Sequence, residues 1–194
     1  MYFRKFVVGF ISLMLVGCGF GDVSNEVLIN TLPDQLYSYY KNPSLQIQYP
    51  KGFQIKTRNQ VSEMFSNAVE LLFESEKQGP IMKSVIVVEV FSIPVNSSFD
   101  ETVAAFYDNN NSRLVNFVEL PSEIYNTVVG GQYFQTELKH FLGRRNLSGN
   151  DVEFFQTYLV KGGKLYMVTA AFDPLDPFME SESLRESLKT ATIF

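Results

Sequence analysis

The two residue types that carry most nucleophilic and metal chemistry in proteins each occur once in this chain, as Cys18 and His140. One thiol and one imidazole cannot supply the three or four nitrogen and sulfur ligands that a zinc site needs. The sequence also contains no Gly-x-Ser-x-Gly elbow, no Walker loop and no zinc-protease helix motif. We therefore expect no metal, no cofactor and no enzymatic activity.

The remaining candidates for chemistry are His140 and a group of carboxylates near the C-terminus. By strand alternation His140 lies on the same face as Leu138 and Leu142, so we expect a half-buried structural histidine. The carboxylates could bind calcium, but they lack EF-hand spacing and suit a solvated, acidic helix start. They are Asp173, Asp176, Glu180, Glu182 and Glu186.

Cys18 follows a short apolar segment at the N-terminus. Arg4 and Lys5 form a positive start, and Phe6 to Val16 is an apolar run of eleven residues broken only by Gly9 and Ser12. A helix that crosses the bilayer needs about 20 apolar residues, so this run fits a secretory signal rather than a transmembrane helix.

The residues that end this run, Leu15, Val16, Gly17 and Cys18, resemble the lipobox of bacterial lipoproteins. The resemblance implies that residues 1–17 are a signal peptide and that the Cys18 thiol carries a diacylglycerol as the new N-terminus. Two or three acyl chains, palmitate among them, would then anchor the protein stably in a membrane. Gly19 resembles the pattern for sorting to the outer membrane, facing the periplasm, in a Gram-negative cell. The alternative is an incidental cysteine after a plain signal.

The composition limits the partners that this chain can bind. Sixteen Lys and Arg residues stand against 21 Asp and Glu, which gives a formal charge of -5, and no basic run exceeds Arg144-Arg145. Nucleic acid binding needs a concentrated positive face, so we exclude it. The 45% hydrophobic residues are ample for one packed core.

The rest of the chain divides into a tether and one domain. Residues 18–43 are polar and weakly periodic, which predicts a lipidated N-terminus and a tether, and residues 44–194 then form a single domain. Ser98 stands three residues before Glu101, the spacing of a capping box, and Leu184 and Leu188 mark a second helix. Alternating or β-branched segments predict strands at 45–49, 53–57, 68–75, 82–93, 114–120, 132–142, 151–160 and 164–172.

These patterns predict an α+β fold, in which helices pack on an antiparallel sheet. We expect neighbouring segments to form hairpins, including 45–49 with 53–57 around Pro50-Lys51-Gly52. The clearest hairpin joins 151–160 to 164–172 through Lys161-Gly162-Gly163.

Three stretches together resemble the PsbP superfamily, which includes PsbP of photosystem II and the DcrB-like bacterial lipoproteins. They are LQIQYPKGFQI at 45–55, TYLVKGGKLYMVTAAF at 157–172 and ESLKTATIF at 186–194. The resemblance implies an α-β-α sandwich around an antiparallel sheet and a role as a binding or assembly subunit. It carries over no functional residue, because the histidines that bind metal in photosynthetic relatives need partners that His140 lacks.

Two functions are favoured by these observations, ahead of an unrecognised hydrolase, which would require Asp, Glu and Ser side chains clustered in a cleft. In the first, the chain is a membrane-anchored lipoprotein of the bacterial envelope whose domain binds a protein partner or supports assembly of an envelope complex. In the second, the domain carries a small apolar ligand or lipid between sheet and helices, which 18 Phe and 10 Tyr residues would allow. An enclosed apolar pocket would indicate the carrier, whereas a filled core with an exposed patch would indicate the partner-binding protein.

Overall fold

The structure, a computed structural model, describes residues 31–61, 66–94, 97–176 and 181–194. The predicted signal peptide, the lipobox residues Leu15, Val16 and Gly17, the lipidation site Cys18 and the start of the tether lie outside the described residues. The carboxylate of Glu180 also lies outside them.

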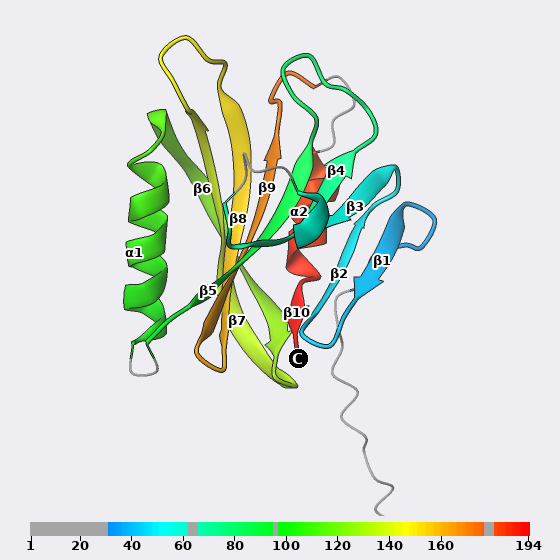
Figure 1. Cartoon of the computed structure of the whole chain (residues 1–194), viewed down its shortest axis with the longest axis vertical. Helices are drawn as coiled ribbons and strands as arrows, with labels where there is room; N and C mark the ends of the chain where they lie inside the picture. Colours follow the sequence, from blue (N-terminus) through cyan, green and yellow to red (C-terminus); the bar gives the residue numbers. More distant parts are fainter. Residues whose placement is uncertain (1–30, 62–65, 95–96, 177–180) are drawn as a thin grey trace, which may run out of the picture.

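The described residues form one curled sheet with a helix on each side (Figure 1). The strand order is β1-β2-β10-β6-β7-β8-β9-β5-β4-β3. The helices are α1 (Phe99–Asn111) and α2 (Ser181–Lys189), and a short 3-10 turn spans Arg58–Gln60. The strands are β1 (Tyr37–Lys41), β2 (Leu45–Pro50), β3 (Phe53–Thr57), β4 (Val69–Ser75), β5 (Val85–Ser92), β6 (Val115–Val129), β7 (Gln132–Arg144), β8 (Val152–Lys161), β9 (Lys164–Phe172) and β10 (Thr192–Ile193).

Successive residues of β9 show how the two helices are placed. Val168 packs in the same cluster as Leu184 and Leu188 of α2, whereas Met167 packs in the cluster of Tyr107 of α1. Because neighbouring side chains of a strand point to opposite faces, α1 and α2 cover opposite faces of the sheet. The larger core lies on the α2 side.

The predicted fold class is met in part. The sheet is largely antiparallel and two helices pack on it, but the short pairing of β10 with β6 is parallel. The domain is also mostly β rather than an evenly layered α-β-α sandwich, because helices of 13 and 9 residues cover only part of a ten-stranded sheet.

Two predicted hairpins are confirmed. β4 pairs with β5, and β8 pairs with β9 from Glu153 opposite Phe172 to Lys161 opposite Lys164. Gly162 and Gly163 form the turn with φ angles of +59° and +72°, the left-handed values that a tight two-residue hairpin turn requires and that glycine adopts without strain.

The hairpin predicted from 45–49 and 53–57 is wrong. β2 pairs with β1 and β10, while β3 pairs with β4 at the other end of the sheet. In the turn between them, the Lys51 amide donates a hydrogen bond to the Leu36 carbonyl, and the Gly52 carbonyl accepts one from the Glu76 amide. The sheet curls so far that its two ends meet at this turn, and the rings of Tyr49 and Phe73 lie 4.8 Å apart across the core.

Strand β1 lies within the segment 18–43 that we expected to be a tether. Its residues pair with β2 from Tyr37 opposite Pro50 to Lys41 opposite Gln46. Leu32 is also held by two hydrogen bonds, one from its amide to the Gln48 side chain and one from that side chain to its carbonyl. Folded structure therefore begins before residue 44.

Candidate functional site

An open groove with a volume of about 380 Å³ runs along one flank of α1. The helix contributes one wall, β7 forms the floor, and Ile124 of β6 stands on the far side. The lining residues are Phe99, Asp100, Val103, Ala104, Tyr107, Asp108, Ile124, Gln135, Thr136, Glu137, Lys139 and Tyr158.

Local sequence explains why α1 presents this flank. The helix starts at the predicted cap, where the Ser98 side-chain oxygen accepts a hydrogen bond from the Glu101 amide at 3.2 Å. Phe106 packs on Phe91 with ring centroids 4.8 Å apart, and Tyr107 packs edge-on against Phe141 at 5.8 Å. These contacts fix the rotation of the helix about its axis. The flank that carries Phe99, Val103 and Tyr107 therefore borders the groove.

The floor and the far wall follow from strand alternation. Gln135, Glu137 and Lys139 are every second residue of β7 and therefore share one face. Ile124 lies opposite Glu137 in the β6–β7 ladder. Its side chain is 60% exposed, which is unusual for isoleucine in the middle of a 15-residue strand.

Tyr107, Glu137 and Lys139, which line the groove, belong to a polar network. Tyr107 donates a hydrogen bond to Glu119, the Lys139 ammonium lies 4.9 Å from the centre of the Tyr107 ring, and Glu137 pairs with Lys139 at 2.8 Å. Burial, together with the hydrogen bond to Glu119 and its charge, raises the pKa of Tyr107 far above its usual range. Tyr107 is therefore a neutral donor at physiological pH.

The pKa of Glu137 moves in the opposite direction. Burial alone would raise it, but hydrogen bonds from Lys139 and Ser122 and the charge of Lys139 lower the pKa below its ordinary value. Glu137 is thus a carboxylate at neutral pH, and it compensates the one ammonium group of the lining. Asp100 and Asp108 then leave the groove with a net negative charge.

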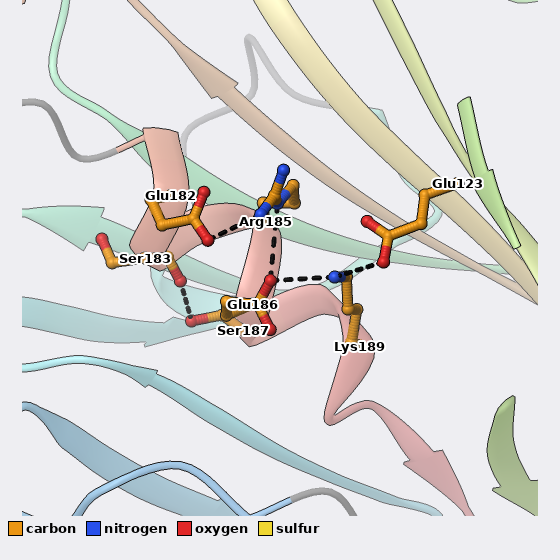
Figure 2. Close-up of polar contacts among 7 residues, drawn as sticks. All are labelled: Glu123, Glu182, Ser183, Arg185, Glu186, Ser187 and Lys189. Atoms are coloured by element: carbon orange, nitrogen blue, oxygen red, sulfur yellow. Dashed lines mark hydrogen bonds and ion pairs between the residues drawn. The ribbon is translucent and has the colours of Figure 1, made fainter. Parts of the chain in front are cut away.

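The back of β6 is held by a charged network on α2 (Figure 2). Lys189 donates to Glu123 at 2.6 Å and to Glu186 at 2.8 Å, and Arg185 donates to Glu182 at 2.6 Å. Glu123 immediately precedes Ile124, so the network fixes the strand at the far wall of the groove.

The predicted site residues lie elsewhere. His140 is half-buried: its Nε2 is 2.7 Å from Glu153 Oε1, and its ring centroid is 4.5 Å from that of Phe155. The Asp173 carboxylate accepts hydrogen bonds from the amides of Ile81 and Leu175. Within the described part of the chain, no three His, Cys, Asp or Glu residues lie together as a metal site would require.

Local sequence patterns did not indicate the groove or the carboxylate beside His140. Glu153 is diagonal to His140 across two paired strands, and no local pattern reports such a relationship. For the groove, a sequence signal was available at Pro121, which interrupts a segment of strand-like residues. In the structure the strand register shifts there, between Leu120 and Glu123. Such irregularities are common beside functional sites.

The sequence itself matches no family model and no curated protein. Solved structures do resemble it. Cyanobacterial PsbP (CyanoP) from Synechocystis sp. PCC 6803 aligns with a TM-score of 0.55 and 10% identity, covering 85% of this chain and 96% of that chain. The chain has a PsbP-like fold.

Two further structures align with the PsbP-like domain. The Ran-binding protein Mog1p of Saccharomyces cerevisiae has a TM-score of 0.52 and 10% identity, and covers 80% of this chain and 94% of that chain. PA94 of Pseudomonas aeruginosa, a protein of unknown function, aligns with a TM-score of 0.50 and 15% identity. The alignment covers 80% of this chain and 95% of PA94. At these identities the likeness establishes the fold.

The two helices of the PsbP-like domain are short and amphipathic. No helix among the described residues has the length and apolar character needed to cross a membrane.

Proposed function

We propose that this chain is a non-enzymatic, lipid-anchored protein of the bacterial cell envelope whose PsbP-like domain binds a protein partner through the α1 groove. The observation that carries the proposal is the exposed Ile124 across an open groove from the half-buried Phe99 and Val103. Apolar side chains gathered in an open groove beside polar groups are typical of a protein contact surface.

The alternative, a carrier of a small apolar ligand, receives less support from the geometry. A carrier would hold its ligand between the sheet and a helix, but on the α2 side this space is filled by Leu184, Leu188 and Ile193, all of them fully buried. The α1 groove is open and has charged walls, which suits a polypeptide better than an enclosed apolar molecule.

The fold neighbours support a binding role. Mog1p, which shares this fold, is described as a Ran-binding protein. The fold can therefore present a protein-binding surface, although fold alone transfers neither the partner nor the site. The proposal that the chain is not an enzyme also draws on His140, whose imidazole is paired with Glu153 and packs against the Phe155 ring at a tilt of 33°.

Photocrosslinking from the groove tests the binding role. A photoreactive residue at Ile124 in the full-length chain, activated in intact membranes, should give one stoichiometric protein adduct. Ala104→Gln, which fills the groove, should abolish that adduct. Ala105→Gln is the matched control, because Ala105 is also exposed on α1 but does not line the groove. No adduct, or equal loss in both variants, would contradict the assignment of the groove.

The anchor is tested separately at Cys18. Only a thiol can carry the thioether-linked lipid, so Cys18→Ser should leave an unprocessed precursor that takes up no acyl label. Metabolic labelling with a palmitate analogue and mass measurement of the N-terminus give the readout. Normal processing and labelling of Cys18→Ser would refute the anchor while leaving the groove assignment intact.

A further inference from the structure

The charges of the α1 groove indicate the chemistry of its occupant. Three carboxylates, those of Asp100, Asp108 and Glu137, line the groove against one ammonium group, that of Lys139. Lys139 is already paired with Glu137 at 2.8 Å. The two aspartates are exposed on α1, and no basic side chain of the lining compensates them. An occupant with positive charge would do so.

The apolar residues indicate its shape. The lining residues of α1 recur at 99, 103 and 107, which places them on one flank over successive helical turns. From Phe99 to Asp108 this flank is about 14 Å long, since a helix rises 1.5 Å per residue. Beside it, Ile124 and Tyr133 lie on the α1 side of the β6–β7 hairpin and are 60% and 61% exposed.

An uncovered sheet face next to a packed helix is a position that a second helix can occupy, because layered packing buries both apolar surfaces. A second copy of this chain fits poorly there. The chain carries a net charge of -5, and no basic run in it is longer than two residues. Two copies would therefore bring like charges together at the groove.

We propose that the α1 groove binds a basic amphipathic helix of a different protein, with lysine or arginine on one face and leucine-like residues on the other. The apolar face of that helix packs on Phe99, Val103 and Ile124, and its basic residues lie near Asp100 and Asp108. This inference rests on the proposed function, because it names the chemistry of the partner that occupies the same groove.

The test uses the full-length chain in uncharged nanodiscs and a photoreactive peptide of leucine and lysine at helical spacing. The readout is the yield of peptide crosslinks to residues 99–108, measured as the peptide concentration rises. Peptide that is bound only to lipid forms no crosslink at these residues and therefore does not contribute. Asp100→Lys with Asp108→Lys should weaken the apparent affinity on the order of tenfold at low salt. Raising the ionic strength to roughly 0.5 M should weaken binding to the unmodified chain.

Glu101→Lys with Glu76→Lys is the matched control. It changes the net charge by the same amount as the test variant. Glu101 shares the first turn of α1 with Asp100, so replacing either carboxylate with lysine costs the same helix stability at that terminus. This control should keep its affinity within about twofold. An unlabelled leucine and glutamate peptide should fail to compete. Equal weakening in both double variants, or competition by the acidic peptide, would overturn the inference.

The two proposals fail in different ways. If the Ile124 adduct forms in membranes and Ala104→Gln removes it, but Asp100→Lys with Asp108→Lys leaves it unchanged, the groove binds a partner that is not basic. The inference is then wrong and the proposed function stands. If the Ile124 adduct never forms, the proposed function itself fails.

Discussion

Lys189 at the end of α2 and Glu123 in β6 are 66 positions apart in the chain, and the Nζ and Oε1 atoms of the two side chains lie 2.6 Å apart (Figure 2). Glu123 follows the register shift of β6 and immediately precedes Ile124. The ion pair therefore joins the C-terminal helix on one face of the sheet to the groove wall on the other. The C-terminal helix and the groove wall are thus held by adjacent residues of the same strand.

Replacing Lys189 with Met should lower the free energy of unfolding by about 1 kcal/mol, because Glu123 and Glu186 lose the ammonium group that they share at a half-buried site, and Glu186 keeps only its longer contact with Arg185. The Lys189 side chain is 13% exposed and bonds to both Glu123 and Glu186. Urea denaturation gives the measurement. Arg185→Met on the same helix is the control. Arg185 pairs with the more exposed Glu182 at 2.6 Å and with Glu186 at 3.4 Å, but not with Glu123, and its loss should cost only a few tenths of a kcal/mol. Equal costs would show that the Glu123 pair adds nothing.

Glu137→Gln should destabilise the domain at neutral pH, and the difference should shrink as the pH falls. Burial opposes ionisation of Glu137, but Lys139 and Ser122 lower its folded-state pKa below the ordinary 4.5. A depressed folded-state pKa contributes stability above the unfolded value, and this contribution is lost as the pH falls through the folded value. Unfolding free energies of both proteins across this range provide the check. A difference that stays constant with pH would contradict it.

Glu89→Gln should have the opposite effect and stabilise the domain at pH 7. Burial raises the pKa of Glu89 above its ordinary 4.5, and the Ser66 hydrogen bond and the charge of Arg145 offset this only in part. The ionised carboxylate therefore costs stability as the pH rises from 4.5 through the folded value. The gain should vanish below pH 4.5 in the same denaturation assay. Glu76→Gln, at an exposed carboxylate, should change little at either pH.

Leu188→Ala should lower the free energy of unfolding by about 2–5 kcal/mol, because it leaves a cavity between α2 and the sheet. Leu188 is fully buried in the larger core, together with Leu184 and Ile193. The matched control is Leu147→Ala at a position that is 80% exposed, where the change should stay within about 0.5 kcal/mol. A cost for Leu188→Ala no larger than that of the control would show that α2 is not part of the stable core.

Local patterns predicted the elements better than their partners. Ser98 caps α1 as expected, and Gly162-Gly163 turns β8 into β9. In contrast, alternation in 45–49 and 53–57 correctly indicated two strands with a buried face but led to a wrong hairpin. Alternation reports that one face is buried, and it carries no information about which strand lies alongside.

Strand β6 shows a second limit of local patterns. We expected a strand only over residues 114–120. The strand instead continues to Val129, since Pro121 lies within a register shift that needs no amide donor there. That shift separates Leu120 and Glu123, and it also turns Ile124 toward the α1 groove.

Short-range energetics were readable in the sequence alone: eight of the ten strands, the capped start of α1, the apolar stripe of α2 and the acidic balance of charge. Only the tertiary structure decided that β2 and β3 lie at separate places in the sheet order, that Glu153 lies beside His140 and that the β6–β7 face next to α1 stays open. These features depend on which strand edges meet once the sheet curls, and that outcome is set by the burial of side chains from the whole chain rather than by any one segment.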